Sequence, residues 1–143
     1  MLTTDLIIIG AGPGGYETAL LAARRGLSVA LIERGEVGGT CLNEGCIPTK
    51  ALCRTAAMVS DFAEAEAFGV KDVAFSLDFP AVMERKRAVV KQLRDGVESL
   101  ISNPNIHLLR GEARFVDALT VEAAGERVTA KDVIIATGSS SAM

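Results

Sequence analysis

The sequence has few aromatic residues, a single histidine and no excess of positive charge. Its 143 residues include no tryptophan, one tyrosine and five phenylalanines, so few side chains could stack on a planar ligand. Fifteen lysines and arginines against eighteen acidic residues give a net charge of −3, which argues against a nucleic-acid partner. The balance of 49% hydrophobic and 23% charged residues is typical of a globular domain with a core of its own.

Long apolar segments are also missing. The longest apolar run, Leu6 to Gly15, is interrupted by glycines and is shorter than the ~20 residues that a membrane-spanning helix needs. The first residues include Asp5 and no basic residue, which argues against a secretory signal. We therefore expect a cytoplasmic protein with no membrane partner.

Cysteine is scarce, and all three cysteines lie in one short stretch, at Cys41, Cys46 and Cys53. An odd, clustered set argues against the disulfide framework of a secreted protein. The spacing of Cys41 and Cys46, with one distant histidine in the chain, does not match a zinc site. Cys53 follows Cys46 too late for a plant-type iron–sulfur cluster. We expect no metal site, and a redox-active Cys41–Cys46 pair remains.

A disulfide between Cys41 and Cys46 would need irregular backbone. Residues five apart in an ideal α-helix have Cα atoms about 8.6 Å apart, whereas a disulfide needs them within about 7 Å. The segment from about Thr40 to the early sixties is otherwise predicted to be one helix. Gly45 and Pro48 are where an irregular first turn would be tolerated.

The pattern of apolar residues predicts an α/β fold. Short β-branched runs typical of buried parallel strands occur at Leu6–Ile9, Leu27–Ile32 and Val133–Ala136. A helix is expected from Tyr16 to Arg25, and a long amphipathic helix from about Ala81 to Ser102. Its apolar face is predicted from Val82, Val89, Leu93, Val97 and Leu100. Four further short strands are expected at 106–109, 113–116, 119–122 and 127–129.

The first strand runs into a glycine-rich turn, Gly10-Ala11-Gly12-Pro13-Gly14-Gly15, that opens a helix. Glycines at the first, third and sixth positions are typical of a dinucleotide-binding turn, in which the backbone approaches a pyrophosphate at the helix N-terminus. Pro13 suits the first helical turn. Glu33, at the end of the next strand, can accept the ribose hydroxyls of an adenosine. This turn alone does not distinguish FAD from NAD.

The two motifs together favour FAD. A nicotinamide delivers hydride, whereas thiols and disulfides exchange through attack of a thiolate on sulfur. Flavin reacts with both, so a glycine turn followed by a cysteine pair indicates a flavin site.

The stretch Gly38-Gly39-Thr40-Cys41-Leu42-Asn43, continued by Cys46-Ile47-Pro48-Thr49-Lys50, resembles the redox-active segment of the pyridine nucleotide-disulfide oxidoreductases. Within that family the motif is most similar to the dihydrolipoamide dehydrogenase branch. Mercuric reductase and other disulfide reductases remain alternative assignments. The resemblance spans the whole chain. It implies a Rossmann-like FAD-binding fold with a central parallel sheet and a small added β-meander.

The resemblance also implies roles for individual residues. Cys41 would exchange with a dithiol or disulfide substrate such as lipoamide, Cys46 would lie next to the flavin, and Lys50 would approach flavin N5. The remaining residues would contact FAD through the glycine turn, the start of the redox helix and two later turns: Gly10, Gly12, Pro13, Gly14, Gly15, Glu33, Gly39, Thr40, Ala113, Thr137 and Gly138.

Members of this family continue into an NAD domain and a dimerisation domain, and these 143 residues contain no second glycine fingerprint. We therefore expect residues 1–143 to be the truncated N-terminal portion of an FAD-binding domain. In the complete enzyme, a homodimer, electrons would pass from a dithiol through Cys41, Cys46 and FAD to NAD+. The alternative is a non-enzymatic module that binds FAD or ADP, and we expect the 143 residues alone to be inactive.

Overall fold

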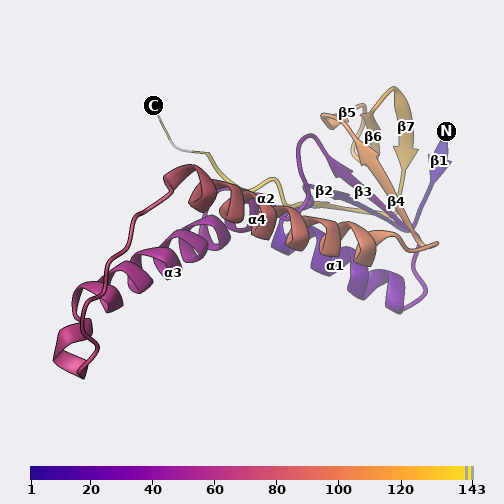
Figure 1. Ribbon diagram of the computed structural model, residues 1–143. Helices are drawn as coiled ribbons and strands as arrows, with labels where there is room; N and C mark the ends of the chain where they lie inside the picture. Colours follow the sequence, from indigo (N-terminus) through magenta and orange to yellow (C-terminus); the bar gives the residue numbers. More distant parts are fainter. Residues whose placement is uncertain (141, 143) are drawn as a thin grey trace.

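The computed structural model describes residues 1–140 and 142. A parallel sheet lies between a layer of helices and a smaller sheet, and one helix of that layer continues beyond the sheet, beside a further helix (Figure 1). The predicted α/β fold with a central parallel sheet and a small added β-meander is confirmed.

The central sheet has four parallel strands, in the order β4-β3-β2-β8. They are β2 (Leu6–Ile9), β3 (Val29–Glu33), β4 (Ile106–Arg110) and β8 (Asp132–Ile135). Each lies within two residues of a predicted strand. Because β2 pairs with β3 on one side and with β8 on the other, the chain reverses its direction of winding at β2.

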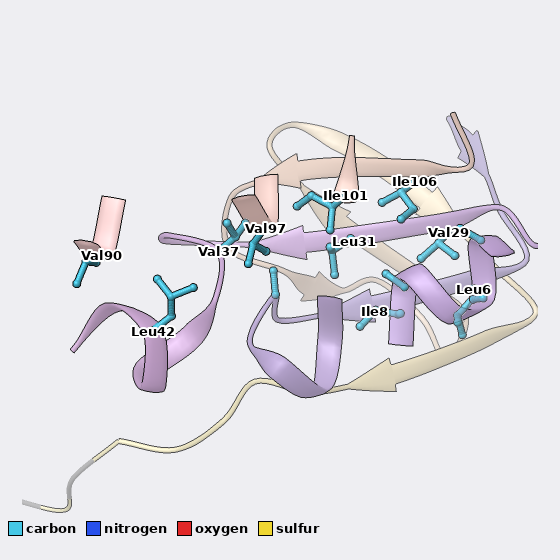
Figure 2. Packing of buried hydrophobic residues seen from close by; sticks show 14 residues of the cluster. Leu6, Ile8, Val29, Leu31, Val37, Leu42, Val90, Val97, Ile101 and Ile106 are labelled. Atoms are coloured by element: carbon cyan, nitrogen blue, oxygen red, sulfur yellow. The ribbon is translucent and has the colours of Figure 1, made fainter. Parts of the chain in front are cut away.

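Helices α1 (Pro13–Arg24) and α4 (Phe79–Ile101) cover one face of this sheet (Figures 1 and 2). Helix α1 begins at Pro13, three residues before the predicted Tyr16, because a proline needs no intrahelical partner in the first turn. Helix α4 begins after Asp78, whose carboxylate accepts the Ala81 N–H at 3.1 Å. The core beneath these helices contains alternate residues of the central strands, with α4 contributing three: Leu6, Ile8, Val29, Leu31, Ile106, Val90, Val97 and Ile101.

A second sheet, in the order β1-β7-β6-β5, covers the opposite face of the central sheet. Its strands are β5 (Arg114–Phe115), β6 (Thr120–Ala123) and β7 (Glu126–Thr129), joined as an antiparallel meander, and β1 (Leu2–Thr3), which pairs in parallel with β7. Strand β1 was not predicted, since two residues carry no periodic signal. Ile7, Ala30 and Ile32 pack against Val121 and Val128.

The segment after β3 differs from its prediction. Instead of one helix from Thr40, the chain forms a short helix α2 (Gly39–Asn43) and a separate helix α3 (Cys46–Ala63). Gly45 lies at the break with φ −118° and ψ −106°. A turn of 3-10 helix, η1 (Ala65–Phe68), then leads towards α4, which returns alongside α3 (Figure 1). The predicted irregularity is therefore a complete interruption of the helix.

Two burial predictions were wrong. On α4, Val97 of the predicted apolar face is buried as expected, but Leu93 and Leu100 are exposed; the other buried positions are Val90 and Ile101, because the sheet meets a face rotated from the predicted one. Strand β8 has the buried type of sequence, yet Ile135 is 66% exposed. It is an edge strand, paired with β2 alone among the described residues.

Across those same residues, no helix combines the length and the apolar character that crossing a bilayer requires.

Asp5 joins three segments at the amino end of the central sheet. Its carboxylate accepts the Lys131 ammonium at 2.8 Å, the Ser28 hydroxyl at 2.8 Å and the Ser28 N–H at 3.0 Å. The hydrogen bond from Lys131, followed by those from Ser28, holds the pKa of Asp5 well below its ordinary value. A depressed carboxyl pKa stabilises the fold above the unfolded pKa, and this stabilisation is lost as the pH falls towards the folded pKa.

We therefore expect Asp5→Asn to lower the free energy of unfolding at neutral pH and to weaken its decline in acid, because the titrating group is gone. Urea unfolding of the intact protein between about pH 3 and pH 7 measures this difference. Asp95→Asn, which removes an exposed carboxylate paired within α4, is the matched control. If Asp5→Asn and wild type showed the same pH dependence, Asp5 would have no such role.

Candidate functional site

A cleft of about 360 Å³ lies at the carboxyl ends of the parallel strands. The ends of β2 and β3 and the segments that follow β4 and β8 all contribute to its wall. It is lined by Ile9, Gly10, Ile32, Glu33, Arg34, Gly111, Glu112, Ala113, Thr137, Gly138, Ser139 and Ser140. In open parallel sheets, ligands bind at this edge, where the direction of winding reverses. The position of the cleft therefore agrees with a nucleotide site.

Two glycines of the turn between β2 and α1, Gly10 and Gly15, leave no room for a side chain. Gly10 has φ +102°, in the left-handed region, and a Cβ there would collide with the Ala136 carbonyl. A Cβ on Gly15 would collide with the carbonyl oxygen of Gly10. These two glycines bring α1 directly against the end of β2, as the dinucleotide pattern predicts.

The first turn of α1 presents free donors. Gly12 precedes the helix, Pro13 is its first residue, and both Gly15 and Tyr16 donate to the Gly12 carbonyl at 2.9 Å. Within the described part of the chain, the N–H groups of Gly12 and Gly14 have no hydrogen-bond partner. A helix N-terminus with unpaired N–H groups favours an anion such as a phosphate.

Glu33 reaches across the cleft to the glycine turn. One carboxylate oxygen accepts the Ala11 N–H at 2.7 Å and the other accepts the Gly35 N–H at 2.8 Å. Each oxygen keeps a further lone pair that could accept a hydroxyl. The side chain thus holds the turn in place while it lines the cleft.

Cys41 and Cys46 form a disulfide. Their Cα atoms are 4.7 Å apart, much closer than the ~8.6 Å of an unbroken helix. The interruption at Gly45 makes this approach possible, because it lets α2 fold back over the first turn of α3. The bond and the irregular backbone that the sequence predicted are both present.

The disulfide lies at an exposed helix N-terminus. Cys46 is the first residue of the 18-residue helix α3, where the positive end of the helix dipole favours a thiolate once the bond is reduced. Pro48 occupies the third position, where its missing N–H leaves no helical bond unmade. Both cysteines and Lys50, one turn further along, are exposed.

The glycine turn and the disulfide segment are in direct contact. The Gly38 N–H donates to the Ala11 carbonyl at 2.8 Å. A Cβ on Gly39, which has φ +64°, would lie 2.9 Å from the Cα of Gly12. The start of α2 is therefore held against the turn that precedes α1, so a ligand on that turn would lie beside the segment that carries Cys41.

Comparison with known proteins identifies the family. A family model described as pyridine nucleotide-disulphide oxidoreductase matches residues 4–143. The chain belongs to this family.

Relatives within the pyridine nucleotide-disulphide oxidoreductases agree with the predicted branch. A dihydrolipoyl dehydrogenase of Chlamydia muridarum is 45% identical over 138 residues, covering 94% of this chain and 30% of the relative. A dihydrolipoyl dehydrogenase of Thermus scotoductus is 48% identical over 139 residues, covering 97% of this chain and 30% of the relative. The chain thus spans about 30% of the length of these relatives.

A solved structure agrees as well. An HOCl-induced flavoprotein disulfide reductase from Escherichia coli, solved as a Cu(II) complex, matches with a TM-score of 0.80 and 30% identity. The match covers all of this chain and 30% of that protein.

The structure of this family member brings most of the predicted site residues together. Gly10, Glu33, Ala113, Thr137 and Gly138 line the cleft. The rest of the predicted set lies on the glycine turn or along the disulfide segment: Gly12, Pro13, Gly14, Gly15, Gly39, Thr40 and Lys50. None of these seven residues lines the cleft itself, and Pro13, Gly14, Thr40 and Lys50 are exposed.

Among the cleft-lining residues that the sequence analysis did not assign to the site, Ser139 and Ser140 carry hydroxyl groups that could contact a ligand. Their hydroxyls follow the predicted Thr137-Gly138 turn directly, and that adjacency is the signal that could have identified them.

Within residues 1–140 and 142, no three His, Cys, Asp or Glu side chains gather as metal ligands would.

Proposed function

We propose that the intact protein is an FAD-dependent oxidoreductase similar to dihydrolipoyl dehydrogenase, which oxidises a dithiol such as dihydrolipoamide and reduces NAD+. The observation that carries this proposal is the Cys41–Cys46 disulfide at the N-terminus of α3, in a segment whose start at Gly38 and Gly39 packs against the glycine turn beside the nucleotide cleft. The relatives named dihydrolipoyl dehydrogenase support the choice of substrate.

The residues present fit FAD. The free N–H groups at the start of α1 would bind the pyrophosphate, and Glu33 would accept the adenosine ribose hydroxyls. The backbone at Ala113 would hold the adenine, while Thr40 and the Thr137-Gly138 turn would contact the rest of the cofactor. FAD, when bound, supplies the two-electron chemistry that links a dithiol to a nicotinamide. Residues 1–143 would then be the first part of its binding domain.

The chain's own contribution is thiol–disulfide exchange. One substrate thiolate attacks the exposed Cys41 sulfur, the Cys41–Cys46 bond breaks, and Cys46 leaves as a thiolate favoured by the α3 dipole. The second substrate thiol then displaces Cys41. The substrate becomes a disulfide, and its two electrons and two protons pass to the protein. Lys50, one turn after Cys46, would place a positive charge near the reduced pair.

We further propose that the intact protein is a cytoplasmic homodimer, and that the 143-residue chain alone does not turn over. NADH with lipoamide is the assay for this last point. Measurable activity of the 143 residues alone would show that the nicotinamide site does not need a second glycine fingerprint.

The function is tested by purifying the intact protein and recording its visible spectrum and its reduction of NAD+ by dihydrolipoamide. We expect flavin absorbance and turnover. Glutathione disulfide and Hg(II), each with NADPH, are the comparison substrates. Flavin absorbance with turnover only on a comparison substrate would reassign the protein to another disulfide reductase or to a mercuric reductase. The absence of bound flavin would contradict the proposal altogether.

A further inference from the structure

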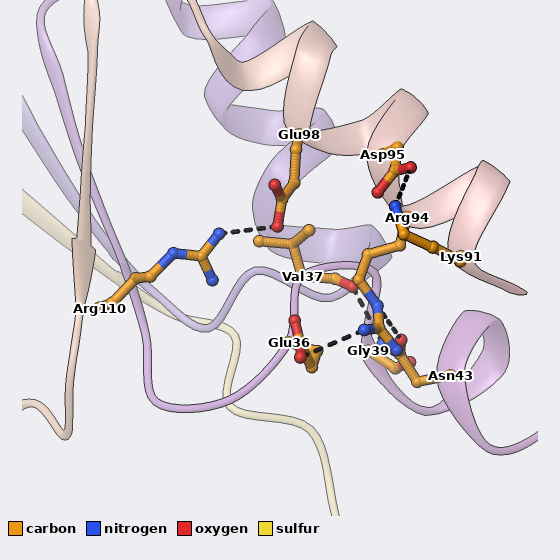
Figure 3. Close-up of polar contacts among 9 residues, drawn as sticks. All are labelled: Glu36, Val37, Gly39, Asn43, Lys91, Arg94, Asp95, Glu98 and Arg110. Carbon is orange, nitrogen blue, oxygen red and sulfur yellow. Dashed lines mark hydrogen bonds and ion pairs between the residues drawn. The ribbon is translucent and has the colours of Figure 1, made fainter.

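The Arg94 side chain joins the long helix α4 to the segment that carries Cys41 (Figure 3). Its Nε donates to the Asn43 Oδ1 at 2.9 Å, across 51 residues of sequence. Its Nη1 lies 3.2 Å from the Glu36 Oε1. The Arg94 side chain is only 26% exposed, whereas the Glu36 side chain is 55% exposed, so the guanidinium is better shielded from water than the cations of the other ion pairs on α4. One guanidinium thus contacts the chain on both sides of Cys41.

Asn43 in turn binds the backbone at the start of α2 and just before it (Figure 3). Its Nδ2 donates to the Val37 carbonyl at 2.9 Å and to the Gly39 carbonyl at 3.0 Å. Since Asn43 is two residues after Cys41 and three before Cys46, its orientation fixes how α2 approaches α3. The Leu42 side chain adds an apolar anchor, packing in the same core as Val90 and Val97.

Other ion pairs on α4 do not have this geometry. Glu84–Arg87 and Lys91–Asp95 each join residues of α4 itself, and their side chains are 55% exposed or more. Arg110 binds Glu98 and so connects α4 to β4, away from the cysteines. Lys91 lies close to Arg94 on the same helix and contacts neither Asn43 nor Glu36 (Figure 3). It therefore offers a matched control.

We propose that Arg94 is a positioning residue for Cys41, acting through Asn43 and Glu36 to hold α2 where the disulfide with Cys46 can close. This inference rests on the proposed function, because it concerns the same redox pair. A tethered α2 raises the effective concentration of the Cys41 thiol at Cys46, and so shifts the equilibrium towards the disulfide. Releasing the tether favours the dithiol.

The test is an equilibrium of the intact protein with reduced and oxidised dithiothreitol without oxygen. In this exchange, dithiothreitol closes to its cyclic disulfide, and the Cys41–Cys46 bond accepts the two electrons and two protons. Alkylation of free thiols followed by mass spectrometry measures the reduced fraction. We expect Arg94→Met to shift the equilibrium constant towards the dithiol by about tenfold, or ~30 mV for two electrons. Lys91→Met should stay within about twofold of wild type.

Arg94→Lys keeps the charge but loses the planar fork, so a smaller shift in the same direction is expected. This variant decides the question if Arg94→Met does not fold. Equal constants for wild type and for the folded Arg94 variants would overturn the positioning role, as would an equal shift in Lys91→Met. A wild-type protein whose cysteines do not exchange with dithiothreitol would instead contradict the proposed function, so the two failures are distinguishable.

Discussion

Replacing Cys46 with serine in the intact protein is expected to abolish the long-wavelength absorbance that a thiolate beside a flavin produces on reduction. The corresponding Cys41→Ser variant should keep that absorbance, because Cys46 remains as the thiolate at the N-terminus of α3. Both variants should lose dithiol turnover almost completely, since exchange needs both sulfurs of the pair. Anaerobic visible spectroscopy and the NAD+ assay measure the two effects.

Cys53 provides the control for these variants. It lies on the same helix as Cys46, is exposed and is not part of the disulfide. Cys53→Ser should therefore leave both the absorbance and the turnover of wild type unchanged. Turnover of either Cys41→Ser or Cys46→Ser at the wild-type rate would rule out the dithiol mechanism.

The second large effect is expected at Gly15. An alanine there would bring its Cβ into the Gly10 carbonyl oxygen, and this backbone group cannot move without separating α1 from β2. Gly15→Ala should therefore cost about 3 kcal/mol in the free energy of unfolding, comparable to other overpacked core substitutions. FAD affinity should fall with it, because the displaced N-terminus of α1 is the proposed pyrophosphate site. Urea unfolding and flavin fluorescence measure the two losses.

Gly96→Ala is the matched control for Gly15→Ala. Gly96 lies within α4, and a Cβ there would meet no atom within 4 Å. Alanine should stabilise that helix by about 0.5–1 kcal/mol and leave FAD affinity unchanged. The tight approach of α1 and β2 would be wrong if Gly15→Ala proved as stable as Gly96→Ala.

The elements with strong local signals were predicted from the sequence. The run Leu6–Ile9, the glycine turn and the strand that ends at Glu33 each lie where the pattern placed them, because buried parallel strands and tight turns restrict composition strongly. The irregular backbone at Gly45 was predicted as well, since no regular helix lets Cys41 and Cys46 form a bond.

Features set by tertiary packing were not predicted. Strand β1 exists because it pairs with β7, more than a hundred residues away in sequence. The buried face of α4 was predicted only at Val97, because Leu93 and Leu100 suit an apolar face equally well, and only the docking angle leaves them exposed. The exposure of Ile135 likewise follows from the edge position of β8, which composition does not reveal.

The polar contacts of the site could be predicted even less. The sequence indicated that Glu33 faces a ribose, but not that its carboxylate also holds the Ala11 and Gly35 N–H groups. Asn43 was identified from the sequence only as part of the motif around Cys41. Its bond to Arg94 spans 51 residues, and no local pattern marks such a pair.

The central claim is that the Cys41–Cys46 disulfide exchanges electrons with a flavin bound beside it. An anaerobic titration of the intact protein with dihydrolipoamide, followed by visible absorbance, tests this most directly. We expect about one equivalent to open the disulfide and to generate the thiolate–flavin absorbance. A flavin spectrum that does not change while the disulfide opens, or a disulfide that dihydrolipoamide does not open, would contradict the account.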